Sequence, residues 1–469
     1  MSLKRQLSTN ERSVSPPLAK RRLQSVTTKT AIASFFTPAS QKEPEKTSWH
    51  VHDETLLIAR YGSATLTALP TSRPAKVAAF DFDSTLITSA SGKKFSRDAT
   101  DWKWWCGTVP ATLKKLNEEG YTIVVISNQG GISLRSDPKS AKSDQKSLAN
   151  FKGKVNAVFS QLDLPISLYA ATARDIYRKP RTGMWERLLK DHHLLNPDAI
   201  DLAQCLFVGD AGGRSGHTTG NVAKDHACSD RDFAANVGIV FRTPEEYFLG
   251  EDVQPFTRTF DHSLYLPDKH SIAPAASPFG FSKNNSVDVV LFCGSPGSGK
   301  STFYATHLRP LGYERVNQDI LKTRERCLKF ASEHLSRGES VAVGESEVEH
   351  ARTGEERGRH GADVVLPDNT NADAETRAQW VKLAKQFDVP IRCILFTAEA
   401  KLCEHNDTVR ALGGTLMNPE GRKMLPRVAF AGFASRYREP TLKEGFQDIT
   451  KVDFEVSIDQ YIMNVHTQA

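Results

Sequence analysis

Two stretches of this chain alternate short apolar runs with segments of helical pattern. In the first stretch the apolar runs are KVAAFDFD, YTIVVISN, ISLYAAT and CLFVGD, and helical patterns such as VPATLKKLNEEG stand between them. A second stretch opens in the same way at VDVVLFCG. Strands separated by helices pair in parallel, because each helix returns the chain to the end of the sheet at which the previous strand began. The sequence therefore predicts an α/β fold with two doubly wound parallel-sheet domains.

Composition divides the 469 residues into four segments. Residues 1–48 are rich in Ser, Thr, Pro, Lys and Arg and poor in apolar clusters, which predicts a disordered basic tail. We expect the first folded domain over residues 49–250 and the second over residues 287–469. The stretch 251–286 has little periodicity and is expected to be a linker.

The net charge of +6 belongs to the tail. Residues 1–48 hold nine Lys and Arg against three Glu, so the other residues balance at 52 basic and 52 acidic side chains. A nucleic-acid surface on the folded part therefore has to be a local patch. The chain lacks a run of eighteen apolar residues and an apolar signal core at its start, and its seven cysteines form no CxxC pair. These features predict a cytosolic or nuclear protein with reduced thiols, without structural zinc or membrane contact.

A pair of aspartates ends the first apolar run. Asp81 and Asp83 stand two residues apart at the end of a predicted strand, where the chain turns and both carboxylates can reach one place. One aspartate can accept a phosphoryl group as a nucleophile while the second carries a proton. An isolated Asp-x-Asp is usually a surface turn, so later segments have to decide between the two interpretations.

Three later features follow predicted strands in order. Ser127 and Asn128 end VVISN, where a hydroxyl and an amide can hold phosphate oxygens. Lys179, which precedes a proline, supplies a cation for a phosphoryl group. Asp210 in FVGD offers a carboxylate suited to Mg²⁺. Together with the aspartate pair, these signals favour a phosphate-handling site over a surface turn.

The second stretch carries a phosphate-binding loop. GSPGSGKST satisfies GxxxxGK[ST] and stands between the apolar run VDVVLF and a helical pattern. Its glycines let backbone N–H groups surround a β-phosphate at a helix N-terminus, where the helix dipole favours anions. Lys300 would bridge the β- and γ-phosphates, and Ser301 would ligate Mg²⁺. The predicted nucleotide-binding residues are Gly294, Ser295, Gly297, Ser298, Gly299, Lys300, Ser301 and Thr302.

Three residues beyond this loop are candidates for the same site. Asp319 in VNQD stands at a predicted helix start, where a carboxylate can orient and deprotonate an accepting hydroxyl; a simple N-cap is the alternative. Asp368 in PDNTN stands where a strand of the Walker-B type would end. Arg410 lies in a basic segment after the apolar run that ends in LFTA.

The first set of motifs resembles the haloacid dehalogenase phosphatase superfamily. By this resemblance Asp81 is the nucleophile and Asp83 is the general acid and base. Ser127 and Lys179 would steady the phosphoryl group. Mg²⁺ would be held by Asp81, Asp210 and the backbone carbonyl of Asp83.

A phosphatase of this kind followed by a P-loop kinase resembles the eukaryotic polynucleotide kinase 3′-phosphatase family over residues 48–465. Segments such as RKPRTGMWE, TPEEYFLGE, DNTNADAETR and EPTLKEGF carry the resemblance. It implies a bifunctional DNA repair enzyme that removes 3′-phosphates and phosphorylates 5′-hydroxyls at strand breaks, with Mg²⁺ and ATP. By it Asp319 is the general base, Arg326 contacts the acceptor phosphate and Arg410 is a lid arginine. Asp230 matches a further acidic position, where structural and catalytic roles are equally expected.

Two features depart from that family's pattern. The vertebrate members carry an N-terminal forkhead-associated domain, whereas here only the tail precedes the first domain. The family also runs from a VAV-like strand into DNTN, whereas this chain inserts the polar segment GESEVEHARTGEERGRHGADVVLP at residues 344–367. Its composition favours a translated intron or a gene-model error, and a species-specific loop is the alternative. The alternative function is accordingly a 3′-phosphatase and repair adaptor with a defective kinase domain.

The tail carries two kinds of short motif. Basic clusters at residues 4–5 and 20–22 resemble a bipartite nuclear import signal, with solubilising charge as the alternative. We therefore expect a nuclear protein. Ile32, Phe35 and Phe36 resemble the box with which repair proteins dock on the sliding clamp, although a lysine stands where the box usually has glutamine. Packing of these side chains on the phosphatase domain is the alternative.

A small-metabolite phosphatase fused to a small-molecule kinase is the remaining rival. The basic tail and the extent of the resemblance count against it. We expect DNA with 3′-phosphate or 5′-hydroxyl ends as the binding partner, and a monomeric protein.

Overall fold

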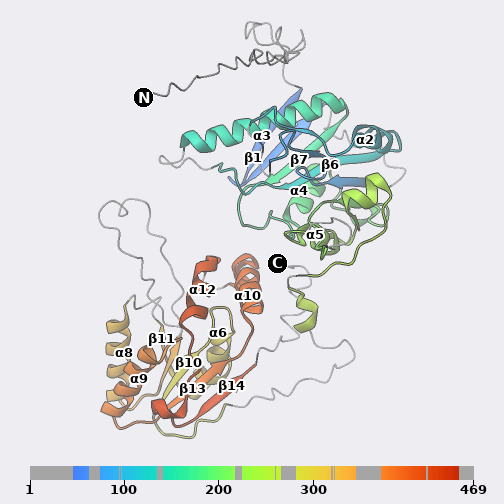
Figure 1. Ribbon diagram of the computed structural model, residues 1–469. Coiled ribbons are helices and arrows are strands. Elements are labelled where there is room, and N and C mark those ends of the chain that lie inside the picture. Colours follow the sequence, from blue (N-terminus) through green and yellow to red (C-terminus); the bar gives the residue numbers. More distant parts are fainter. Residues whose placement is uncertain are drawn as a thin grey trace, which may run out of the picture. The chain divides into compact units, whose positions relative to one another are not determined.

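The computed structural model describes most of the chain outside the tail. The described residues are 46–62, 74–93, 96, 98–134, 141–216, 224–258, 260–265, 281–317, 321, 323–344, 371–418 and 421–453. They form two α/β sheets, one of seven strands and one of five, and each sheet carries helices on both faces (Figure 1). None of the helices in the described part of the chain has the length and apolar character needed to cross a membrane.

The seven-stranded sheet has the order β1-β2-β7-β6-β3-β8-β9. Its strands are β1 (Thr47–His52), β2 (Leu56–Tyr61), β3 (Lys76–Phe80), β6 (Tyr121–Asn128), β7 (Ile166–Ala171), β8 (Leu206–Val208) and β9 (Val240–Arg242). The strands from β7 to β9 pair in parallel, as the alternation of apolar runs and helices predicts. β1 and β2 form an antiparallel hairpin, and β2 pairs with β7. This hairpin was not expected from the sequence. A two-stranded ribbon pairs β4 (Ile87–Thr88) with β5 (Lys103–Trp104).

Two longer helices cover each face of this sheet (Figure 1). α2 (Val109–Glu118) and α3 (Ala141–Leu162) pack on one face, and α4 (Gly183–Asp191) and α5 (Ser229–Val237) pack on the other. In α2, the buried positions 109, 113 and 116 recur at helical spacing, so one stripe of the helix meets the sheet. Short helical turns are η2 (Pro197–Ala199), η3 (Glu245–Leu249) and η4 (His262–Tyr265).

The five-stranded sheet has the order β11-β12-β10-β13-β14, and all its strands are parallel. Its strands are β10 (Val289–Cys293), β11 (Glu314–Asn317), β12 (Val341–Gly344), β13 (Ile391–Phe396) and β14 (Ile449–Val452). β10, β12 and β13 are buried along their whole length, which suits strands covered on both faces.

The helices of the second sheet divide in the same way. α8 (Arg324–Ser336) and α9 (Ala374–Gln386) pack on one face, and α6 (Lys300–Phe303) with η5 (Tyr304–Leu308) packs on the other. The remaining elements are η6 (Arg309–Leu311), α10 (Ala400–Leu412), α11 (Gly414–Met417), α12 (Arg427–Arg436) and η7 (Leu442–Glu444).

Arg377 anchors α9 to its surroundings. This fully buried arginine donates to Glu444 through Nε and Nη2, at 2.7 and 2.9 Å. Its Nη1 donates to the carbonyls of Asn371, Ala372 and Arg438 at 2.9–3.0 Å. A single guanidinium therefore joins the segment before α9 to the segment after α12.

In both sheets the strand order reverses about a central strand. β3 lies between β6 and β8, and β10 lies between β12 and β13. In open α/β sheets the crevice for a ligand opens at the carboxyl ends of the strands at such a reversal. The two places where function is expected are therefore the ends of β3 and β10.

Two candidate active sites

Three carboxylates gather at the carboxyl edge of the first sheet. Asp81 directly follows β3, Asp210 follows β8, and Asp230 lies in the first turn of α5. One carboxylate oxygen of each lies within 4.8 Å of those of the other two. Gly209 permits this approach, because a Cβ atom there would lie 2.3 Å from Asp230 Oδ2. From the sequence, structural and catalytic roles were equally expected for Asp230, and the structure brings it into the cluster.

Lys179 inserts its ammonium group among these carboxylates. Its Nζ lies 3.0 Å from Asp81 Oδ1 and 2.8 Å from Asp230 Oδ1, and the residue is 3% exposed. Asn128 fixes the backbone of Lys179 by donating to its carbonyl at 3.1 Å and accepting from its N–H at 2.9 Å. Burial alone would lower the pKa of Lys179, but the charges of Asp230 and Asp81 outweigh it and raise that pKa. Lys179 is therefore a fixed cation at neutral pH.

The three carboxylates carry more charge than Lys179 compensates. Burial, followed by the charges of Asp81 and Asp230, raises the pKa of Asp210 to about 8. Burial also raises the pKa of Asp230. A divalent cation would compensate the excess charge, and carboxylate oxygens are the ligands that Mg²⁺ prefers. The donor set of Asp81, Asp210 and Asp230 therefore fits Mg²⁺.

Gln129 links the second aspartate of the pair to Ser127. Its Nε2 donates to Asp83 Oδ2 at 2.7 Å and to Ser127 Oγ at 3.0 Å. Lys154 on α3 lies 3.9 Å from Asp83 Oδ1, and the Asp83 side chain is half-exposed. Neither neighbour was identified from the sequence. Gln129 directly follows Ser127 and Asn128, so its position in the sequence could have indicated it. Lys154 reaches the site only because α3 packs across this face of the sheet.

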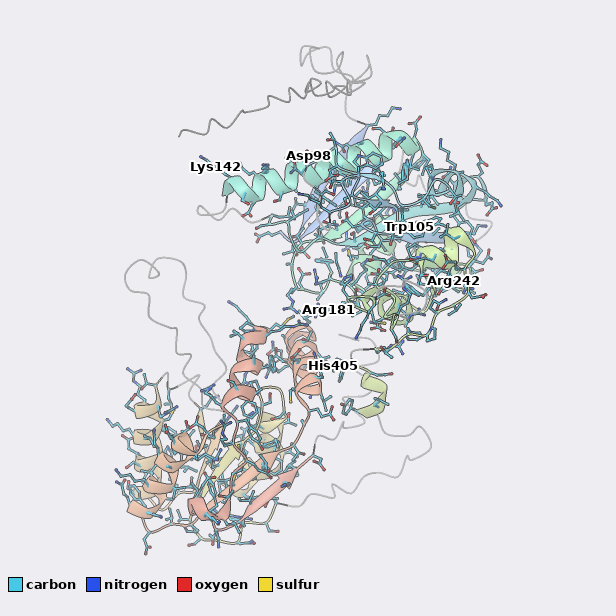
Figure 2. All side chains as sticks on the ribbon, in the orientation of Figure 1. Asp98, Trp105, Lys142, Arg181, Arg242 and His405 are labelled. Atoms are coloured by element: carbon cyan, nitrogen blue, oxygen red, sulfur yellow. The ribbon has the colours of Figure 1, made fainter. Side chains whose placement is uncertain are left out.

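Arginines flank the loop that carries Lys179. Arg178 lies so close to Gly130 that a Cβ atom there would be 3.0 Å from its Nη1. Arg181, labelled in Figure 2, donates from Nη1 to the Asp175 carbonyl at 2.9 Å. Burial lowers the pKa of Arg181 to about 10, so it remains charged at neutral pH. With the exposed Arg174, these side chains form a local basic patch beside the first site, of the kind that the balanced net charge requires.

In the second sheet, the phosphate-binding loop runs from β10 into α6. Gly297 and Gly299 have positive φ angles of 74° and 96°, which glycine adopts without steric cost. A Cβ atom on Gly297 would lie 2.3 Å from the Cys403 carbonyl oxygen. A glycine is therefore required at this position by the close approach of α10.

Lys300 points into the loop. Its Nζ donates to the carbonyls of Gly294 and Ser295 at 2.7 and 2.6 Å, and to Ser298 Oγ at 3.3 Å. The residue is 2% exposed. From this position an ammonium group can meet the β- and γ-phosphates of a nucleotide held by the loop.

The two residues after Lys300 differ in their surroundings. Ser301 Oγ accepts a hydrogen bond from Arg315 Nη2 at 3.0 Å, whereas the Thr302 side chain is exposed. In a P-loop, the Ser or Thr after the lysine supplies its hydroxyl to Mg²⁺, and the position of Ser301 in the loop fits that role. Arg315, on the edge strand β11, was not identified from the sequence.

Helix α10 closes on the phosphate-binding loop. Asn406 donates from Nδ2 to the Gly297 carbonyl at 3.1 Å. The buried Asp407 accepts from Arg410 Nη2 at 2.5 Å and from the Leu425 N–H at 2.8 Å. Arg410, a predicted lid residue, is thus held on a helix that touches the loop. Arg326 lies in the first turn of α8 with its side chain exposed.

Several predicted features lie outside the described residues. They are Asp319, Asp368, the segment 345–367, the basic clusters of the tail, and Ile32, Phe35 and Phe36.

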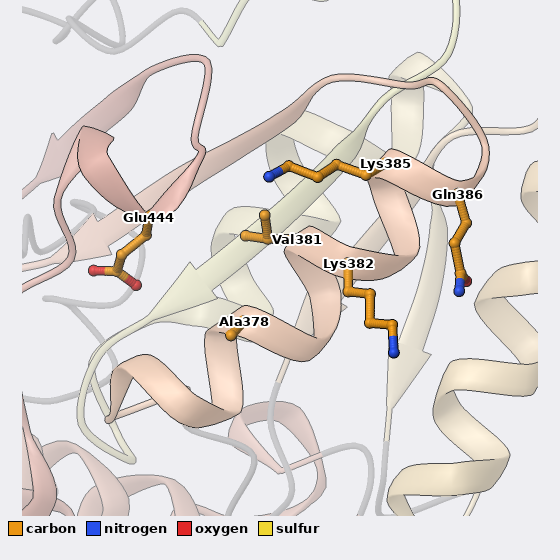
Figure 3. Close-up of a pocket in the computed structure, with 6 residues that line it drawn as sticks. All are labelled: Ala378, Val381, Lys382, Lys385, Gln386 and Glu444. Atoms are coloured by element: carbon orange, nitrogen blue, oxygen red, sulfur yellow. The ribbon is translucent and has the colours of Figure 1, made fainter.

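A surface pocket of about 460 Å³ lies beside α9. It is lined by Ala378, Val381, Lys382, Lys385, Gln386 and Glu444 (Figure 3). None of the predicted site residues lines it, and Glu444 is already bound to Arg377. This pocket is therefore separate from the two strand-end sites.

Comparison with known proteins matches the segments of the two sheets to two different families. The model of the polynucleotide kinase 3 phosphatase family matches residues 76–248, and that of an AAA domain family matches residues 289–440. The bifunctional polynucleotide phosphatase/kinase of Schizosaccharomyces pombe is 38% identical over 408 residues, which cover 87% of this chain and 85% of that protein. This chain belongs to the bifunctional polynucleotide phosphatase/kinase family.

Two further relatives of this family are more distant. A putative bifunctional polynucleotide phosphatase/kinase of Acanthamoeba polyphaga mimivirus is 28% identical and covers 81% of this chain and 85% of that protein. The polynucleotide 3′-phosphatase of Saccharomyces cerevisiae is 30% identical and covers 37% of this chain and 87% of that protein.

Proposed function

We propose that this chain is a DNA-end repair enzyme that removes 3′-phosphates and phosphorylates 5′-hydroxyls at strand breaks. One observation carries the proposal. A single chain of this family holds both the Asp81 cluster with its buried Lys179 and a complete phosphate-binding loop ending at Lys300 and Ser301. We assign the phosphatase to residues 49–250 and the kinase to residues 287–469.

In the phosphatase, the proposed reaction has two steps. Asp81 attacks the phosphorus and forms an aspartyl-phosphate, while the 3′-oxygen leaves with a proton from Asp83. A water molecule then attacks the aspartyl-phosphate, Asp83 takes its proton, and inorganic phosphate departs. Lys179 and Ser127 hold the phosphoryl oxygens. Mg²⁺ held by the carboxylate cluster would supply positive charge to those oxygens.

The half-exposed position of Asp83 suits its role, because an acid that protonates a leaving group must also exchange protons with water. The basic patch around Arg178 and Arg181 offers cations to the phosphodiester backbone next to the reacting end. These contacts would fix the strand without reading its sequence.

In the kinase, Asp319 is proposed to take the proton of the 5′-hydroxyl as that oxygen attacks the γ-phosphorus of ATP, and ADP leaves. Lys300 and Arg410 neutralise charge on the transferring group, and Arg326 contacts a phosphate of the acceptor strand. Ser301 is the side chain that would hold Mg²⁺, and the ion would supply positive charge to the phosphates of the nucleotide.

A nicked duplex tests both activities together. The strand break carries a 3′-phosphate and a 5′-hydroxyl, and the wild-type protein is supplied with Mg²⁺ and ATP. We expect conversion of both ends, at rates far above those on small phosphate esters and small alcohols. Equal turnover of the small compounds would instead favour a small-metabolite enzyme.

We further propose that the tail directs the protein to the nucleus and docks on the sliding clamp through Ile32, Phe35 and Phe36. Replacing Phe35 and Phe36 by alanine should weaken clamp binding at least about tenfold, since two aromatic anchors are lost, without changing turnover on short oligonucleotides. Leu23→Ala with Val26→Ala is the matched control in the same tail. Unchanged clamp affinity in a titration would eliminate the docking proposal.

Deleting residues 344–367 should raise 5′-kinase activity. The deletion joins Val343 of β12 to Asp368, and Asp368 has to lie at the end of a parallel strand to help organise Mg²⁺ and the nucleotide. A misplacement of about 1 Å can cost roughly a hundredfold in rate. Full-length and deleted proteins are compared with ATP and a 5′-hydroxyl oligonucleotide.

A third protein controls for that deletion. In it, residues 345–366 are replaced by Gly and Ser at the same length, and we expect the activity of the full-length chain. If the full-length protein is more active than both variants, the segment is a working part of the enzyme and the suspicion of an intron or gene-model error is wrong.

A further inference from the structure

Arg315 lies beside the phosphate-binding loop and belongs to none of its motif positions. Its Nη2 donates to Ser301 Oγ at 3.0 Å, and its Cζ lies 5.5 Å from the centre of the Tyr304 ring. The Tyr304 hydroxyl donates at 2.9 Å to the carbonyl of Tyr313, which directly precedes the strand of Arg315. Arg315 is therefore held against the helical turns that begin at the loop.

The strand that carries Arg315 determines the side of the sheet on which it acts. β11 pairs with β12 so that Arg315 lies opposite Ala342 and Val316 opposite Val343. Ala342 belongs to the core on the α6 face, whereas Val316 and Val343 belong to the core under α8 and α9. Side chains alternate along a strand, so Arg315 projects to the α6 face.

The hydroxyl that Arg315 contacts is the one that a P-loop offers to Mg²⁺, beside the β- and γ-phosphates. A guanidinium at 3.0 Å from this oxygen is therefore next to the place of those phosphates. Mg²⁺ on this hydroxyl would repel the guanidinium and favour its transfer to a neighbouring anionic group. The adjacent phosphate oxygens match its two parallel N–H groups.

We propose that Arg315 binds the γ-phosphate of the nucleotide and is a further catalytic residue of the kinase site. The inference rests on the proposed kinase function. Lys300 approaches the phosphates from inside the loop, and Arg315 approaches from the edge strand, so the transferring group is neutralised from two sides. In the sequence, Asp319, the proposed base for the accepting hydroxyl, follows Arg315 by four residues.

The first test compares Arg315→Gln and Arg315→Lys in the full chain with the wild type. ATP and ADP binding, each with Mg²⁺, are titrated by calorimetry, and kinase turnover is measured on a 5′-hydroxyl oligonucleotide. We expect Arg315→Gln to weaken ATP binding about tenfold or more, to change ADP binding less than about twofold, and to lower kcat about a hundredfold. Arg315→Lys should be intermediate, because lysine keeps the charge and loses the fork. Arg309→Gln, at an exposed arginine of η6, is the matched control and should behave as the wild type.

A second comparison separates a direct contact from orientation of the Ser301 hydroxyl. In a Ser301→Ala background, adding Arg315→Gln should still weaken ATP binding about tenfold. No further loss would mean that Arg315 acts only through Ser301, and the proposal would be wrong. Equal losses for ATP and ADP would overturn the assignment to the γ-phosphate. A wild-type protein that binds ATP without kinase turnover would refute the kinase function itself, and the binding comparison would still decide the contact.

Discussion

Asp81→Asn should abolish 3′-phosphate removal and leave ATP-dependent 5′-phosphorylation unchanged. The amide keeps the shape of the side chain and cannot form the aspartyl-phosphate, so we expect a fall of roughly 10⁴-fold or more in phosphatase kcat. The kinase rate should be that of the wild type, because its phosphates are held by a different sheet. Both activities are measured on one preparation with a 3′-phosphorylated and a 5′-hydroxyl oligonucleotide.

The stability of this variant provides an internal check. Asp81 pairs with Lys179, but it also repels Asp210, whose pKa it helps to raise. Removing one of three crowded carboxylates relieves that repulsion, so the melting temperature should not fall markedly. Asp252→Asn, at an exposed position, is the matched control. A well-folded Asp81→Asn protein that had lost both activities would contradict the model of two separate sites.

Lys300→Ala should have the reciprocal effect and remove only the kinase. Lys300 is buried within the loop, and no other side chain described there offers an ammonium group to the loop carbonyls that it contacts. Loss of a preorganised cation from the transferring phosphoryl group should lower kcat by roughly three orders of magnitude.

A comparison with Lys382→Ala makes this result specific. Lys382 is exposed on α9 in the surface pocket of Figure 3, so its replacement removes the same charge from a helix packed on the same sheet without touching the loop. We expect wild-type kinase turnover in that variant. Equal loss in both lysine variants would indicate a general effect of charge and would remove Lys300 from the catalytic role.

The ends of the strands were predictable because the signals there are local. Asp81, Ser127 and the phosphate-binding loop each follow an apolar run directly, and the structure places each at the carboxyl end of a strand. The β1–β2 hairpin was not predicted. β2 is almost entirely buried and lacks the apolar–polar alternation that identifies a half-exposed strand.

The neighbours of the functional groups were harder to predict, because they depend on which elements lie side by side. Lys154 reaches Asp83 from the middle of α3, and Arg315 reaches Ser301 from an edge strand. Neither belongs to a spaced motif, and each contact follows from strand order and helix packing. Asp230 is intermediate: its motif was visible, but its place among the carboxylates depends on the small size of Gly209.

The buried guanidinium of Arg377 has a consequence for the evolution of this chain. It pins Asn371 and Ala372 on one side of residues 345–370, while pairing with β10 and β11 pins β12 on the other. When both ends of a flexible segment are held, the entropic cost of closing it rises only with the logarithm of its length, by about 0.6 kcal/mol per doubling. Segments of different length at this point would then change the free energy of unfolding little, so selection for thermostability would act on their length only weakly. Their length would be free to drift until it disturbed the rate of phosphoryl transfer.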